Sequence, residues 1–132
     1  AANIARRVSF IREQPKIEIP FDLDTVTSRT LYMLRSGIDA FLRGDELLAI
    51  GVCEDDEIVD GENRKCFCRV ESEIKNTPDT AMAEVNYLLV SKLFERIADL
   101  CTNIAEDVIY MKHSIIVRHN LKAAAEDIKR ML

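Results

Sequence analysis

Two breaks in the helical pattern divide the middle of the chain into three long segments. Gly44-Asp45 combines a helix stop with a fresh N-cap, and Thr77-Pro78-Asp79 combines an N-cap with proline at the first helical position. Apolar residues recur at helical spacing around these breaks, so we expect helices over about 22–43, 46–75 and 78–112. The 132 residues include only four Gly and three Pro, which leaves little turn chemistry for a sheet. Long helices with short connections pack as antiparallel neighbours, so the sequence predicts an all-α antiparallel three-helix bundle.

Weaker helical patterns flank this central region. Residues 1–14 follow the spacing of the end of a helix, and residues 120–132 carry a C-terminal helical extension. Pro15 and Pro20 bracket an extended linker, because each proline biases the residue before it away from helix. We therefore divide the chain into the end of a preceding helix, a three-helix unit over 15–119 and the C-terminal extension.

Charge and cysteine content exclude some classes of protein. The formal net charge of −5 argues against nucleic acid as a partner, since phosphate-binding proteins carry a basic stripe. No signal peptide and no apolar run of membrane-spanning length is visible, so we expect a cytoplasmic protein. Cys66-x-Cys68 lacks the spacing of a zinc knuckle, and we expect all four cysteines to be buried or half-buried free thiols.

Acidic side chains on two of the expected helices form the candidate site. One helical face of the last long segment carries four polar residues at i, i+4, i+8 and i+11: Glu95, Asp99, Asn103 and Glu106. Asp56 and Asp60 repeat the i, i+4 spacing on the preceding segment, where Asp56 and Asn63 interrupt an apolar stripe that runs from Val52 through Phe67. Facing helices of a bundle can join two such carboxylate pairs into an oxygen-rich site that suits Mg, Ca, Mn or Fe.

Two alternatives remain open on spacing alone. Acidic pairs at i, i+4 are common on solvated helix faces, and Arg64 or Arg96 could neutralise these acids instead of a metal. A redox enzyme is disfavoured because di-iron bundles use Glu-x-x-His pairs, whereas Ala98 stands three residues after Glu95. No nucleophile–histidine pattern or glycine-rich phosphate loop is visible, so we expect no catalytic residues.

Several of these stretches together resemble one known family. Phe94–Asp99 and Thr102–Tyr110 resemble the signature of the phosphate-uptake regulator family, PhoU. Weaker similarities to the family's other motifs occur at Glu54–Asp60, Thr77–Asp79 and Ile116–His119. The resemblance covers about residues 15–119. Two residues depart from the family pattern: Leu100 stands where a histidine is frequent, and Gly61 where a large apolar residue is usual.

The resemblance implies a fold and a metal site. Members of the family have two tandem three-helix repeats that form a six-helix bundle, so this chain is similar to the C-terminal repeat. Ala1 to Val8 then resemble the end of the first repeat's third helix. The family's E/D-x-x-x-D motifs bind metal ions, with iron the first expectation and Mn, Mg, Zn or Ni as alternatives. By position, the implied metal ligands are these residues, the last two being weaker candidates: Asp56, Asp60, Glu95, Asp99, Asn103 and Glu106.

The resemblance also implies a function. Family members are non-enzymatic homodimers that restrain the phosphate-starvation response. They contact the ATPase subunit of the phosphate ABC transporter and a membrane sensor histidine kinase, which implies a cytoplasmic protein, peripheral at the inner face of the membrane. Two alternatives stay open: a cytosolic PhoU-like domain of a sodium–phosphate cotransporter, and a carboxylate-metal helical-bundle enzyme.

Overall fold

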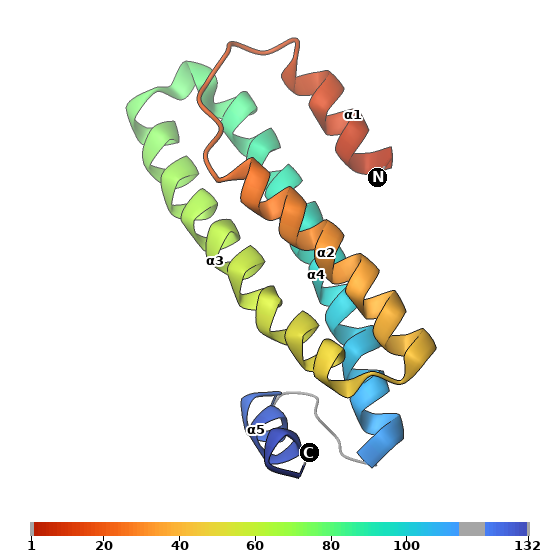
Figure 1. Ribbon diagram of the computed structural model, residues 1–132. Coiled ribbons are helices and arrows are strands. Elements are labelled where there is room, and N and C mark those ends of the chain that lie inside the picture. Colours follow the sequence, from red (N-terminus) through yellow and green to blue (C-terminus); the bar gives the residue numbers. More distant parts are fainter. Residues whose placement is uncertain (1, 114–120, 132) are drawn as a thin grey trace.

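The computed structural model describes residues 2–113 and 121–131, and every regular element in these ranges is helical. The elements are α1 (Ala2–Ile11), α2 (Leu23–Arg43), α3 (Glu46–Asn76), the short 3₁₀ helix η1 (Pro78–Thr80), α4 (Ala81–His113) and α5 (Leu121–Met131). Figure 1 shows α2, α3 and α4 as a long antiparallel three-helix bundle. Helix α1 packs against α4 near one end of the bundle, and α5 lies against α3 near the other. The expected all-α bundle is confirmed.

The α2–α3 connection has the geometry that its sequence predicts. The Asp22 carboxylate accepts a hydrogen bond from the Thr25 amide at 3.0 Å and caps α2. Gly44 ends that helix in the left-handed region with φ of 64°, which glycine adopts without a steric penalty. The Asp45 carboxylate then accepts from the Leu48 amide at 3.0 Å and caps α3. A single pair of residues thus ends one helix and begins the next.

The α3–α4 connection differs from the expectation. Pro78 begins the 3₁₀ helix η1, and α4 starts only at Ala81. The Thr77 side chain makes no capping hydrogen bond; the Thr77 carbonyl instead accepts from the Thr80 amide at 3.1 Å. Helix α3 itself runs without interruption through Gly61. The expected domain boundary at 119/120 and the Ile116–His119 motif lie outside the described residues.

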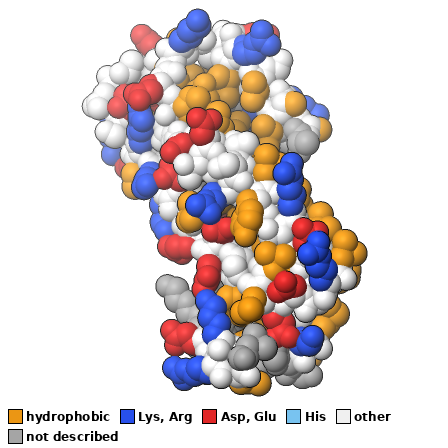
Figure 2. All heavy atoms as spheres, in the orientation of Figure 1, with side chains coloured by type: hydrophobic (Ala, Val, Ile, Leu, Met, Phe, Trp, Pro, Cys, Tyr) orange, Lys and Arg blue, Asp and Glu red, His pale blue; other side chains and the backbone are white. Residues whose placement is uncertain are grey.

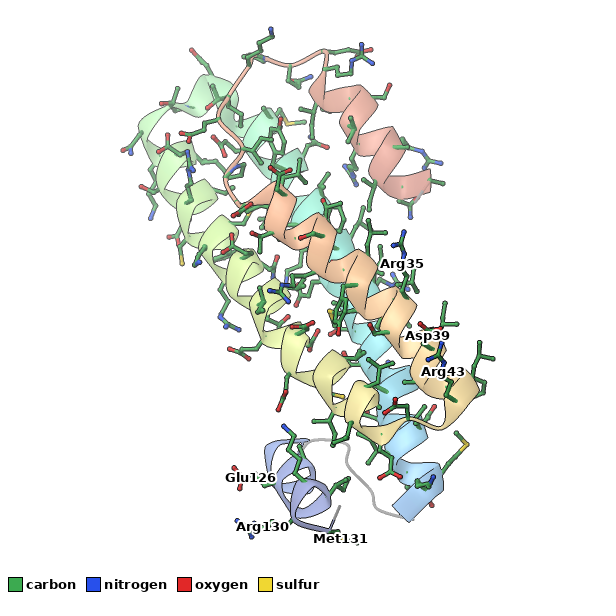
Figure 3. All side chains as sticks on the ribbon, in the orientation of Figure 1. Arg35, Asp39, Arg43, Glu126, Arg130 and Met131 are labelled. Atoms are coloured by element: carbon green, nitrogen blue, oxygen red, sulfur yellow. The ribbon has the colours of Figure 1, made fainter. Side chains whose placement is uncertain are left out.

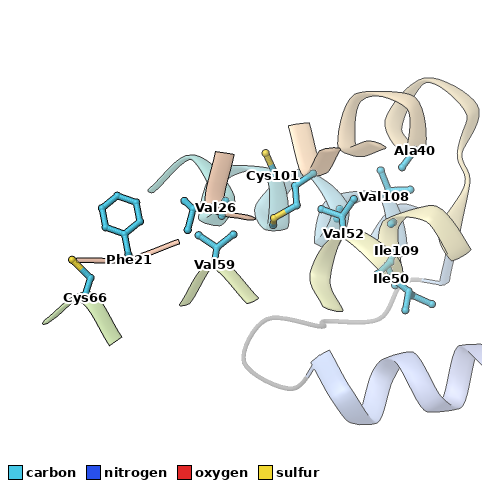
Figure 4. Close-up of a cluster of buried hydrophobic side chains, with 14 of the residues drawn as sticks. Phe21, Val26, Ala40, Ile50, Val52, Val59, Cys66, Cys101, Val108 and Ile109 are labelled. Atoms are coloured by element: carbon cyan, nitrogen blue, oxygen red, sulfur yellow. The ribbon is translucent and has the colours of Figure 1, made fainter. Parts of the chain in front are cut away.

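The core is built mainly from medium and small side chains. Buried apolar residues of α2, α3 and α4 form one cluster, part of which Figure 4 shows: Val26, Met33, Ala40, Ile50, Val52, Val59, Cys66, Cys101, Val108 and Ile109. Ala98 and Ala105 of α4 are completely buried, and such small residues let neighbouring helices approach closely. The inward stripe of α3 passes through buried Cys66, whereas Phe67, which the apolar spacing places on that stripe, is exposed.

Helix α2 buries its small residues and exposes many of its large ones. Its buried positions include Ser36, Gly37 and Ala40, and a Cβ atom added at Gly37 would lie 3.7 Å from the Cys101 carbonyl oxygen. Besides Tyr32, five large apolar residues that share one side of α2 are exposed instead: Leu31, Leu34, Ile38, Phe41 and Leu42. We call this set the α2 apolar face.

Charged side chains follow a second edge of α2. Arg35, Asp39 and Arg43 follow one another at four-residue spacing and alternate in sign, on the side away from α3 (Figure 3).

Figure 2 shows hydrophobic side chains gathered in the upper half of the same view of the molecule. Within the described residues, no helix combines the length and the apolarity that crossing a membrane would require.

The cysteines agree with the sequence-based expectation in part. All four are free, Cys66 and Cys101 are buried and Cys53 is half-buried. Cys68 is exposed, contrary to the expectation. Cys66 faces the core and Cys68 does not, because residues two apart on a helix point in different directions.

Candidate functional site

The antiparallel packing of α3 against α4 brings together the two predicted carboxylate pairs. Asp56 and Asp60 come from α3, and Glu95 and Asp99 come from α4. Burial raises the pKa of each α3 carboxyl, and repulsion from both α4 carboxylates adds to the rise. We call these four residues the acidic cluster.

Asp56 is the most perturbed member of the acidic cluster. It is half-buried, and its Oδ1 atom is buried without a hydrogen-bond partner. Burial raises the pKa of Asp56 to about 6, with repulsion from Asp60 and Asp99 adding to the effect. The nearby Thr102 hydroxyl opposes the rise. Near neutral pH this carboxyl therefore lies close to the point where it gains a proton.

Asp60 shares this environment. It too is half-buried with an unpartnered, buried Oδ1 atom. Burial raises its pKa first, followed by repulsion from Glu95 and Asp99, while Arg64 acts in the opposite direction. Arg64 is itself paired with Glu57 at 2.8 Å. It therefore does not provide Asp60 with a direct ion pair.

Glu95, in contrast, is held by neighbouring side chains. Its Oε2 atom accepts hydrogen bonds from Asn63 Nδ2 at 2.7 Å and from Lys92 Nζ at 2.6 Å. Asn63 Oδ1 in turn accepts from the Ser91 hydroxyl at 3.1 Å. The base that neutralises Glu95 is thus Lys92, and not Arg96, which lines a cleft between α1 and α4.

Sequence reasoning did not assign these supporting residues to the site. A signal for Asn63 existed, because it follows Asp56 by seven residues on the same stripe of α3. Ser91 precedes Glu95 by four residues, which places both near one face of α4. A serine in a helix is too common to stand out without the partner helix in view.

The fourth member of the acidic cluster and the two further predicted residues follow one another along α4. Asp99 and Asn103 are exposed, and Glu106 is half-buried. The pKa of the Cys53 thiol rises to about 12, through burial first and then through the negative charges of Glu106 and Asp56. The negative charge of Glu106 therefore acts on the Cys53 thiol.

The donor chemistry of the acidic cluster fits a hard cation, whereas its geometry does not form a finished coordination shell. Carboxylate oxygens suit Mg, Ca, Mn and Fe, and the Asp56 and Asp60 Oδ1 atoms have no competing protein partner. Among the residues that the structure describes, no three Asp, Glu, His or Cys side chains form a group that could hold a metal ion as they stand. The Glu95 Oε2 atom already accepts hydrogen bonds from Asn63 and Lys92, so this oxygen is not free to hold a cation.

The fold and this site define an all-α helical-bundle protein with clustered carboxylates on two facing helices. Residues 23–108 match the PhoU domain, and the matched range includes the whole acidic cluster. The chain belongs to the PhoU family.

Relatives with the same domain come from distant bacteria. The chain is similar to a phosphate-specific transport system accessory protein PhoU homolog of Pseudomonas aeruginosa, with 29% identity over 90% of this chain and 50% of the relative. The PhoU homolog 1 of Thermotoga maritima and the PhoU homolog of Caulobacter vibrioides, both phosphate-specific transport system accessory proteins, are 27% and 32% identical over 85% and 80% of this chain, and 49% and 46% of their own lengths. The chain thus spans about half the length of these curated relatives. No solved structure matches the chain.

Proposed function

We propose that this chain is part of a non-enzymatic regulator of phosphate uptake that acts by contact between helix surfaces. The observation that carries the proposal is the PhoU domain over residues 23–108. The relatives' descriptions as accessory proteins of the phosphate-specific transport system support it. The proposed partners are the ATPase subunit of the phosphate ABC transporter and a membrane sensor histidine kinase, which would place the protein in the cytoplasm at the inner face of the membrane.

A pull-down with the full-length protein tests this function. The purified full-length protein is expected to retain the purified ATPase subunit, or the cytoplasmic part of the sensor kinase, in phosphate-containing buffer. Deleting its gene is expected to leave phosphate-starvation genes active when phosphate is plentiful. Failure to bind either partner, together with normal repression in the deletion strain, would overturn the proposal.

We further propose that the α2 apolar face is the contact between two copies in a homodimer. Phe41 and Leu42 are 55% and 73% exposed, and an apolar hollow of about 240 Å³ lies beside them against Ile104 of α4. Exposed apolar surface of this kind is typical of protein interfaces. The hollow is lined by residues of both α2 and α4, so a second copy could pack against two helices here.

Size-exclusion chromatography with light scattering tests the homodimer. The chain is expected to elute as a dimer, and the double substitution Ile38→Glu with Phe41→Glu to give a folded monomer. Leu47→Glu on α3 is the matched control, since Leu47 is exposed outside the α2 apolar face. A monodisperse wild-type monomer at all concentrations would refute the dimer.

The acidic cluster is proposed as a cation site, with iron as the first expectation. Asp56 and Asp60 would supply the unpartnered oxygens, and Glu95 and Asp99 would complete the donor set once Lys92 moves away. Elemental analysis of the purified full-length protein is expected to find metal that Asp56→Asn with Asp60→Asn removes. Glu57→Gln is the control, because Glu57 is exposed and paired with Arg64. Metal-free wild-type protein after purification without chelators would contradict the site.

A further inference from the structure

A second group of carboxylates lies at the opposite end of the bundle from α5. There the linker before α2 runs beside the connection between α3 and α4 (Figure 1). A solvent-open cavity of about 270 Å³ is lined there by Glu18, Arg69, Glu73, Thr77, Thr80 and Glu84, together with Ile17. None of these residues belongs to the acidic cluster, and none lies in the stretches that resemble the family's metal-binding motifs.

Glu84 is the unusual member of this group. Only 4% of it is exposed, and its Oε2 atom is buried without a hydrogen-bond partner. Burial raises its pKa, repulsion from Glu73 adds to the rise, and Arg69 opposes it. A buried carboxylate without a partner is costly unless a proton, a cation or hydrogen bonds compensate its charge. No described residue donates a hydrogen bond to Glu84 Oε2, so a proton, a cation or water is left to compensate it.

Arg69 does not fill that role, because its hydrogen bonds go to the linker. Its Nη2 atom donates to Glu18 Oε2 at 2.6 Å, and its Nη1 atom to the Ile19 carbonyl at 3.5 Å. Three carboxyl groups and one guanidinium line the cavity, so with all of them ionised the net charge would be −2. One divalent cation would neutralise this charge.

The remaining polar groups of the cavity are oxygen donors. The Thr80 hydroxyl donates its proton to the Thr77 carbonyl at 2.9 Å, so its oxygen can still accept or coordinate. The Thr77 hydroxyl makes no capping hydrogen bond to the helix that follows it. A set of carboxylate and hydroxyl oxygens suits a hard cation, and the open cavity has room for the waters that such ions keep.

We propose that Glu73 and Glu84, with the Thr77 and Thr80 hydroxyls, bind a divalent cation of the calcium type at this end of the bundle. The site ties the end of α3 to the start of α4, beside the linker. Within the described ranges no three Asp, Glu, His or Cys side chains are grouped for a metal, so two carboxylates, hydroxyls and water would share the coordination. The proposal does not depend on the proposed function.

Calcium titration of the whole chain tests the site. The background protein carries Asp56→Asn and Asp60→Asn, so that the acidic cluster cannot bind a cation. It is purified and treated with chelator before the titration. We expect isothermal titration to show saturable binding of one Ca²⁺ per chain, and millimolar Ca²⁺ to raise the melting temperature. Adding Glu84→Gln should abolish both signals.

The control variant and the second test variant carry the same Asp56→Asn and Asp60→Asn substitutions. Glu71→Gln removes an exposed carboxylate of α3 that pairs with Lys75, and it should leave Ca²⁺ binding intact. Glu73→Gln serves as a second variant in case Glu84→Gln does not fold. The proposal fails if the background protein binds no Ca²⁺, which would mean that a proton compensates Glu84. It also fails if Glu84→Gln or a folded Glu73→Gln variant binds Ca²⁺ as well as the background does.

Discussion

The stripe of α3 that is turned toward the core alternates between apolar and polar layers, and the two kinds of layer affect stability in opposite ways. Val52, Val59 and Cys66 are buried among apolar neighbours. Asp56 and Asn63 occupy the positions between them. The apolar layers stabilise the fold by removing surface from water, whereas the Asp56 layer holds repelling carboxylates at the same interface.

The polar layers also differ from each other. The Asn63 side chain is held on both its atoms, by the Ser91 hydroxyl and the Glu95 carboxylate. Asp56, two helical turns earlier, keeps a buried oxygen without a partner. A polar layer can therefore be structural when its hydrogen bonds are complete, and it becomes a candidate binding site when they are not.

The largest expected effect comes from the apolar core, at a buried residue of α3 outside this stripe. Ile50→Ala should lower the free energy of unfolding by about 2–5 kcal/mol, because Ile50 is 1% exposed and its removal leaves a cavity. Ile58→Ala on the same helix is the matched control, with 37% exposure, and should cost less than about 1 kcal/mol. Urea denaturation followed by circular dichroism measures both. Equal losses would mean that burial in the apolar core does not determine the stability.

Overpacking the same interface comes next. Ala98→Leu should destabilise the chain by about 1–3 kcal/mol, because Ala98 is completely buried in α4 and the added atoms have no space. Ala5→Leu is the control, since Ala5 is an exposed helical residue of α1. Thermal unfolding compares the two variants. A neutral Ala98→Leu would show that the α3–α4 packing is looser than the structure describes.

The Asp56 layer should respond in the opposite direction. The folded protein raises the pKa of Asp56 to about 6, so the unfolded chain ionises first as the pH rises, and the native state loses stability between about pH 4 and pH 6. Asp56→Asn should therefore stabilise the protein at pH 7 by roughly 1–2 kcal/mol, allowing for the half-exposed position. The gain should vanish below about pH 4.

Unfolding free energies at pH 3.5 and pH 7 test this sign. Asp55→Asn is the control, since Asp55 is paired with Arg29 at 3.3 Å and its loss should destabilise slightly at pH 7. If Asp56→Asn instead destabilises the protein at pH 7, the Asp56 layer stabilises the fold as the apolar layers do.

The smallest expected effect concerns the ion pair that holds Glu95. Lys92→Gln should cost less than about 1 kcal/mol, because the lysine is half exposed, and the loss should shrink at high salt. Lys75→Gln removes the more exposed pair with Glu71 and should cost less still. Chemical denaturation at low and high ionic strength compares them. A salt-independent loss at Lys92 would indicate that its role is packing.

The sequence predicted the helices and their caps well, because these depend on neighbouring residues. Gly44 and Asp45 act locally, so their roles follow from a few residues on either side. The start of α4 was wrong by three residues, since Pro78 can begin a 3₁₀ helix as readily as an α-helix. The candidate site was predicted in part: the i, i+4 spacing indicated four carboxylates, whereas Asn63, Ser91 and Lys92 were missed.

By itself, the sequence determined where most of the helices begin and end, and that the family is PhoU, since helical periodicity, caps and motif residues are all properties of short stretches. Only the tertiary structure decided which faces are buried. Helical spacing shows that Phe41 and Leu42 belong to a helix, yet they are exposed while Gly37 is buried. The structure likewise decided which carboxylates stay without partners, because that depends on side chains from other helices and on exclusion of water, as at Asp56 and Glu84.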